Sequence, residues 1–368
     1  MSGISTEQIL KALQTVKDPW LNRDLVALDF VRELEVNQDL VKFKLILNRP
    51  SATAQALLKQ AAREAILGLA EVQAVEIETG WEVPAGKSAE GKQSVQGVKN
   101  IVAVSSGKGG VGKSTVAVNL AVALAQVGAK VGLLDTDVYG PNVPMMVGVN
   151  QQPQVRGQML LPNTAHGIKV MSLGFLNPGD RPVVWRGPML HTAVRQFLYD
   201  VEWGELDYLI VDMPPGTGDA QLSLAQLVPV QGAVLVTTPQ EVAMADVRKA
   251  INMFEQVHIP VLGVVENMSY FVCEHCSTRH AIFGTGGGAE LAARFNVALL
   301  GQVPLAVSVR EGGDAGVPIV IGAPDSLQAS AFREIAENVA TQISLQAIKG
   351  AGLPVINLRD NRGDRFAV

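Results

Sequence analysis

The sequence predicts an α/β protein in which a small N-terminal α/β domain precedes a larger domain with a doubly wound, mostly parallel sheet. A polar stretch with glycine and proline but no periodicity, residues 80–97, separates the two parts. After it, short apolar runs alternate with helical patterns, which is typical of strands covered by helices on both faces. These runs are residues 101–104, 131–134, 208–211, 233–237, 261–265 and 299–303.

Length and composition define the class of protein before any motif is considered. The 368 residues suffice for two domains, and we expect a small domain at 1–80, a linker at 81–97, the larger domain at 98–349 and an irregular tail at 350–368. A net charge of −5 argues against extensive nucleic-acid binding. No apolar run approaches the roughly 20 residues of a membrane span, and the N-terminus lacks a signal pattern, so we expect a cytoplasmic protein.

The small domain has a short series of predicted elements. Ser5 and Gln8 form a capping-box pattern at the start of an apolar helical stretch. Residues 28–36 and 40–47 read as a hairpin turned at 37–39, since apolar side chains alternate along the second strand. An Ala- and Leu-rich helix at 53–69 and a strand at 72–78 complete the unit.

The larger domain begins with a strand, a glycine-rich loop and a helix, read as IVAVSSGKGGVGKST over residues 101–115. The pattern G-x-x-x-x-G-K-[ST] builds a cradle of backbone N–H groups for phosphates. Lys113 then reaches the β and γ phosphates, and the Ser114 hydroxyl holds Mg²⁺. The predicted nucleotide loop comprises Gly107, Lys108, Gly109, Gly110, Val111, Gly112, Lys113, Ser114 and Thr115.

Three acids end the next predicted strands. Asp135 and Asp137 follow the run at 131–134, and Asp212 follows the run at 208–211. Singly, each acid could only cap a strand end. Together with the phosphate loop, they indicate carboxyl groups that position Mg²⁺ or an attacking water. The glycine-rich residues 213–219 resemble a switch that senses the γ-phosphate.

These motifs resemble those of known ATPases. The loop with its extra lysine is similar to the deviant-Walker group, which includes MinD, ParA and nitrogenase iron protein. The set GKGGVGKST, DTDVYGPN, WRGPM, DMPPGTGD, ENMSYF-x-C-x-x-C and REGGDAG resembles the Mrp/ApbC iron–sulfur cluster carriers over residues 99–321. The resemblance implies a P-loop NTPase fold and a homodimer in which Lys108 reaches the partner's nucleotide.

The resemblance also implies individual roles. Asp137 matches the acid that orients the attacking water, and Asp212 the acid that holds Mg²⁺ indirectly. Asn267 matches the residue that hydrogen-bonds adenine, although its residue type alone favours a turn former. The N-terminal unit is similar to a cluster-assembly domain that often carries a reactive cysteine. Residues 49–53 read RPSAT here, which excludes a thiol-based metal role for that domain.

Cys273 and Cys276 are the only cysteines, and their spacing is Cys-x-x-Cys. One such pair supplies half the thiolates of a zinc site or an iron–sulfur cluster, and two chains would supply all four. The spacing alone leaves zinc, a cluster and redox chemistry open; the resemblance favours a [4Fe–4S] cluster shared between two subunits. We expect His275 and His280 to be solvated, and the glycine run 284–288 to be a turn.

The predicted function is a homodimeric, ATP-hydrolysing iron–sulfur cluster carrier. It would take a cluster from a scaffold, bind it at the dimer interface and deliver it to apo-proteins, without a nucleic-acid or membrane partner. The alternative is a MinD/ParA-like positioning ATPase on membrane or DNA, which would need a basic amphipathic tail, whereas residues 350–368 contain Pro354 and mixed charges. A reductase like nitrogenase iron protein would instead call for separated cysteines. Arg186 and Arg310 have no assigned role.

Overall fold

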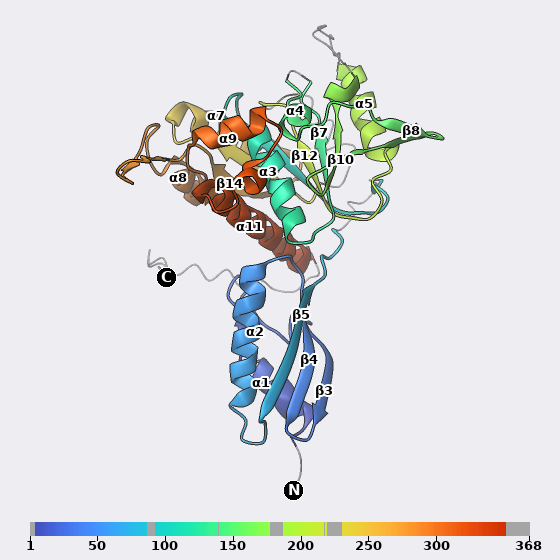
Figure 1. Ribbon diagram of the computed structural model, residues 1–368, viewed down its shortest axis with the longest axis vertical. Helices are drawn as coiled ribbons and strands as arrows, with labels where there is room; N and C mark the ends of the chain where they lie inside the picture. Colours follow the sequence, from blue (N-terminus) through green and yellow to red (C-terminus); the bar gives the residue numbers. More distant parts are fainter. Residues whose placement is uncertain are drawn as a thin grey trace. The chain divides into compact units, whose positions relative to one another are not determined.

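A computed structural model describes residues 4–86, 93–138, 140–176, 187–216, 218 and 230–350 (Figure 1). The chain divides into two compact units, one mainly from the residues up to Glu82 and one from Val83–Ile343. The predicted tail after residue 350 and residues 87–92 of the predicted linker lie outside the described part. The domain boundaries expected from the sequence, at residues 80, 97 and 349, remain a prediction.

The smaller unit is a three-stranded sheet with helices. Strand order is β3–β4–β5, with β3 antiparallel and β5 parallel to β4. The capping box of Ser5 and Gln8 is present, and the predicted hairpin and helix are confirmed. Side chains such as Ile9, Phe43 and Leu58 form its core. Its elements are α1 (Thr6–Leu13), β1 (Lys17–Asp18), β2 (Arg23–Asp24), β3 (Val31–Asn37), β4 (Leu40–Leu47), α2 (Ala52–Leu67) and β5 (Ala74–Trp81).

The larger unit contains, within the described residues, an eight-stranded sheet that is parallel except for the strand β10. All six predicted strands are confirmed, as is the doubly wound α/β class. The sequence missed β10 and β11. In spatial order the strands are β10 (Asn163–Ala165), β11 (Ile168–Ser172), β7 (Val131–Asp135), β12 (Leu206–Asp212), β6 (Val98–Ser106), β13 (Gly232–Thr237), β14 (Val261–Glu266) and β17 (Ala298–Gln302).

Helices cover both faces of this sheet. The helix α3 packs on β6, β7 and β12, and is buried nearly all round, from Val116 to Leu124. On the other face, Phe197 of α5 and Ile251 of α7 join a core with Leu209 and Leu235 of the strands. The helices are α3 (Lys113–Gln126), α4 (Val143–Met146), α5 (Gly187–Tyr199), α7 (Glu241–Gln256), α8 (Gly287–Arg294), α9 (Val307–Asp314), α10 (Ile319–Gly322) and α11 (Leu327–Gly350), whose residues from Ser344 on belong to the smaller unit.

Smaller elements complete the unit. They are a 3₁₀ turn η1 (Leu173–Leu176), the hairpin of β8 (Gln154–Arg156) and β9 (Met159–Leu161), and the hairpin of β15 (Phe271–Val272) and β16 (Arg279–His280). None of the helices in the described part of the chain has the length and apolarity that crossing a membrane requires.

Candidate functional site

The phosphate loop lies between the end of β6 and the first turn of α3, as expected. Gly112 caps α3 with a left-handed φ of 82°. A Cβ atom at this position would lie 2.2 Å from Nδ2 of Asn267, and one at Gly107 would lie 2.2 Å from the backbone of Asp246. Backbone conformation and close approach therefore both require glycine here.

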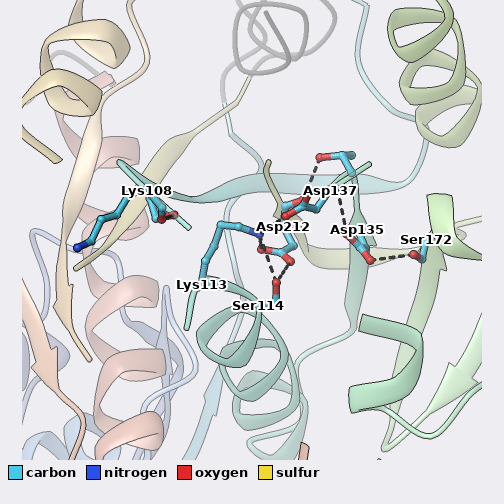
Figure 2. Close-up of polar contacts among 9 residues, drawn as sticks. Lys108, Lys113, Ser114, Asp135, Asp137, Ser172 and Asp212 are labelled. Carbon is cyan, nitrogen blue, oxygen red and sulfur yellow. Dashed lines mark hydrogen bonds and ion pairs between the residues drawn. The ribbon is translucent and has the colours of Figure 1, made fainter. Parts of the chain in front are cut away.

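A cluster of charged groups lies at the start of α3 (Figure 2). The Lys113 ammonium is 2.6 Å from Oδ1 of Asp212 and 3.5 Å from Oδ2 of Asp137. The Ser114 hydroxyl donates to Oδ2 of Asp212 at 2.6 Å. Burial raises the pKa of Asp212, and the Lys113 charge opposes that rise. The structure thus brings together four residues that are up to 99 positions apart in the sequence.

Asp135 lies behind this cluster, opposite Asp212 in the pairing of β7 with β12. It is fully buried, and burial together with the Asp212 charge raises the pKa of Asp135 to about 8. Its Oδ1 accepts from the Asp137 backbone N–H at 3.0 Å, and its Oδ2 accepts from the Ser172 hydroxyl at 2.8 Å. Asp135 therefore holds the backbone that carries Asp137. No sequence pattern predicted the contact of Ser172, because this residue lies on the unpredicted strand β11.

Two adjoining cavities provide room for a nucleotide. One of about 210 Å³ is lined by the phosphate loop, Asp137 and Pro215. The other, of about 350 Å³, is lined by Asn267, Met268 and Leu305 among others, and shares Thr115 with the first. They also share Asn142 and Met146. This arrangement suits phosphates in the first cavity and an apolar base in the second.

The remaining nucleotide-site predictions have different outcomes. Lys108 is half-buried, and its side chain points away from Lys113 and its partners (Figure 2). Of the predicted switch, Gly216 donates its N–H to the Ser106 carbonyl at 2.9 Å, whereas residues 217 and 219 lie outside the described part. Arg186 also lies outside it. Arg310 pairs with Asp314 on α9 at the wall of the larger cavity.

The cysteine pair lies on the loop of the β15–β16 hairpin. Cys273 is half-buried and Cys276 exposed, and both are free thiols. Hydrogen bonds from Cys273 N–H to the Thr278 carbonyl (3.0 Å) and from Ser277 N–H to the Cys273 carbonyl (2.8 Å) shape the loop. The Thr278 hydroxyl, 3.2 Å from the Cys276 sulfur, lowers the pKa of that thiol.

No further ligand completes a metal site at this loop. The described residues contain no group of three or more His, Cys, Asp or Glu side chains that could hold a metal ion. His275 and His280 are exposed, and the His280 ring lies 6.4 Å from that of Phe271. One copy of this part of the chain therefore offers two thiols.

Comparison with known families agrees with this architecture. Residues 97–340 match the ParA model, described as NUBPL iron-transfer P-loop NTPase, and residues 6–78 match the iron–sulfur cluster assembly protein model. The chain belongs to the NUBPL-type iron-transfer P-loop NTPases. The predicted family is confirmed, and with it the assignment of the chain as a nucleotide-binding ATPase.

Relatives from bacteria are similar over nearly their whole length. An "iron-sulfur cluster carrier protein" of Synechocystis is 50% identical over 94% of this chain and 99% of its own length. Its Escherichia coli K12 counterpart is 44% identical over 91% of each chain.

Solved structures are similar to the larger part of the chain. A nucleotide-binding protein of Archaeoglobus fulgidus, in complex with ADP, is 43% identical and has a TM-score of 0.55, covering 60% of this chain and 88% of its own. The cell division ATPase MinD of Pyrococcus furiosus is 25% identical with a TM-score of 0.50, covering 65% and 98%.

Proposed function

We propose that this chain is an ATP-hydrolysing iron–sulfur cluster carrier that acts as a homodimer. The observation that carries the proposal is the pair Cys273 and Cys276 on a hairpin loop, which lies in the same unit as the phosphate-loop site. The bacterial relatives named iron–sulfur cluster carrier proteins support the same cargo. The cargo would come from a cluster scaffold and go to apo iron–sulfur proteins.

Ligand number is the reason for proposing a dimer. A [4Fe–4S] cluster takes four cysteine thiolates, and one copy of the chain has two cysteines. A two-fold axis that places two β15–β16 hairpins face to face supplies the other two. Because the loop is exposed, the cluster would lie where an acceptor protein can reach it.

The ATPase site would use the clustered residues at the start of α3. Lys113 neutralises charge on the β and γ phosphates, and Asp137 orients the attacking water. The donor set fits Mg²⁺, since the Ser114 hydroxyl and the Asp212 carboxyl are oxygen ligands and lie 2.6 Å apart. Ser114 would bind the ion directly and Asp212 through water, and the ion would neutralise phosphate charge.

Two further contacts of the nucleotide are part of the proposal. Asn267 lines the larger cavity and would hydrogen-bond adenine there. Lys108 points away from its own cluster, which agrees with a contact to the partner's nucleotide across the dimer (Figure 2). ATP would then draw two copies together and hydrolysis would release them.

Anaerobic reconstitution with ferrous iron and sulfide tests the proposal. We expect the wild-type chain to gain cluster absorbance with one [4Fe–4S] cluster per dimer, and to activate an apo-[4Fe–4S] enzyme. Cys273→Ala removes a ligand and should abolish both, whereas Ser277→Ala, a matched change in the same loop, should not. Full cluster absorbance in Cys273→Ala would overturn the proposal.

A further inference from the structure

Glu266 is a buried acid that the nucleotide chemistry does not use. It is the last residue of β14, and its side chain is fully buried. Its Oε1 accepts from the Ser269 hydroxyl at 2.5 Å and from the Gln302 amide at 2.7 Å. Its Oε2 accepts from the Gly288 N–H at 2.5 Å. One carboxyl group thus joins three separate segments of the larger unit.

The first of these segments is the base of the cysteine hairpin. Ser269 lies four residues before Cys273, and its N–H donates to the Val303 carbonyl at 2.9 Å. The Leu305 N–H donates to the Tyr270 carbonyl at 2.7 Å. The chain entering the hairpin is therefore paired with residues 303–305, which follow directly on Gln302.

The same two stretches of chain form walls of the nucleotide site. Asn267, the neighbour of Glu266, donates its side-chain N–H to the Val111 carbonyl of the phosphate loop at 2.9 Å. Asn267 and Met268 line the larger cavity, and so do Pro304 and Leu305. A ligand that shifts either wall also shifts the base of the hairpin.

The glycine run at 284–288 has a role in this arrangement. A Cβ atom at Gly288 would lie 2.9 Å from the Glu266 Cβ, and one at Gly287 would lie 2.7 Å from the Pro239 carbonyl oxygen. Glycine therefore lets the first turn of α8 approach β14 closely enough for its N–H to meet Glu266. Gly287 and Gly288 thus begin α8 and are not part of the predicted turn, and Glu266 accepts from this helix start where a phosphate would otherwise bind.

We propose that Glu266 is a positioning residue that couples nucleotide binding to the geometry of the Cys273–Cys276 loop. With two accepting oxygens, the carboxyl group holds β17, α8 and the hairpin base in one arrangement, so a movement of the cavity walls reaches the thiols. The biological purpose of this coupling rests on the proposed cluster carrier function. The coupling itself concerns only nucleotide and thiols.

Alkylation of the metal-free, reduced full-length chain tests the coupling. The chain has two cysteines, so iodoacetamide reports on this loop alone. In the wild type, we expect the alkylation rate to change at least about fivefold when the non-hydrolysable analogue Mg–AMP-PNP saturates the site, at the lower end of ordinary allosteric coupling. In Glu266→Gln, one accepting oxygen replaces two, and we expect the ratio of the two rates to fall to within about twofold of unity. AMP-PNP should bind this variant with wild-type affinity.

Two further variants make the result decisive. Glu290→Gln changes an exposed acid on the same helix α8 and should keep the wild-type ratio. Ser269→Ala removes one of the three hydrogen bonds to Glu266 and should lower the ratio of the two alkylation rates, although less than Glu266→Gln does. If circular dichroism shows that Glu266→Gln is unfolded, Ser269→Ala provides the test instead. The proposal is overturned if AMP-PNP leaves the alkylation rate of the wild-type chain unchanged. It is also overturned if Glu266→Gln or a folded Ser269→Ala shows the same rate ratio as the wild type, or if a folded Glu266→Gln no longer binds AMP-PNP. None of these outcomes depends on cluster reconstitution, which tests the proposed function separately.

Discussion

The nucleotide site and the cysteine loop, both in the larger unit, are built in opposite ways. At the first, Lys113, Asp137 and Asp212 are nearly or fully buried and bound to one another. At the second, a hairpin of two-residue strands carries one exposed and one half-buried thiol. Buried charges need partners in fixed positions, since an unpaired one is costly, whereas exposed thiols tolerate change. The first site is suited to holding a ligand in one geometry and the second to exchanging one.

The largest expected effect comes from breaking the buried cluster. Lys113→Ala removes the cation between two buried carboxyl groups and should cost about 3–5 kcal/mol of unfolding free energy. The loss of a charge at the phosphates should lower kcat for ATP hydrolysis by about 10²–10³-fold or more. Urea unfolding and phosphate release measure the two effects. Lys249→Ala, at an exposed ion pair on α7, is the control and should change neither; equal stability of Lys113→Ala and wild type would contradict the comparison.

The cysteine loop should respond in the opposite way. Cys276→Ser changes an exposed side chain, so the thermal unfolding midpoint should stay at the wild-type value. Iron bound after anaerobic reconstitution should fall to background, because a thiolate ligand is lost. Calorimetry and iron analysis check the two parts. A large drop in the unfolding midpoint would show that the loop is a structural element after all.

The buried acid Asp135 should make the free energy of unfolding depend on pH. Its pKa is raised to about 8 in the folded chain, so between about pH 4 and 8 the folded state holds a proton that the unfolded state has released. Stability should therefore fall as pH rises through this window, by up to about 1.4 kcal/mol per pH unit, and level off above pH 8. Asp135→Asn should lower this slope in urea unfolding from pH 5 to 9 and leave the part that Asp212 contributes through its own raised pKa. Asp325→Asn, at an exposed acid, should keep the full wild-type slope.

The smallest effect concerns the Thr278 hydroxyl, which lowers the pKa of Cys276. Thr278→Val removes that hydrogen bond and keeps the side-chain size. We expect the pKa of the Cys276 thiol to rise toward its ordinary value, so that iodoacetamide reaction at neutral pH slows. The pH profile of alkylation in a Cys273→Ala background measures this. An unchanged profile would mean that exposure alone sets the reactivity of the thiol.

The two regions also differ in how far the sequence predicted them. The phosphate loop is local, since glycine spacing and the following lysine are enough to specify it, and the six apolar runs predicted the central strands. The strand β11 was not predicted because a lysine interrupts the apolar residues of its sequence, Ile168–Ser172. Without this strand, the hydrogen bond from Ser172 to Asp135 could not be predicted either.

By itself, the sequence determined the fold class, the phosphate loop and the thiol pair, because strand periodicity, loop glycines and Cys-x-x-Cys depend on neighbours along the chain. Only the tertiary structure decided which acids meet Lys113, and that Glu266 joins Ser269, Gln302 and Gly288. Such contacts depend on strand order and on how closely a glycine lets α8 approach β14. Buried polar groups take whichever partners the packing brings within reach, and no spacing in the sequence records that choice.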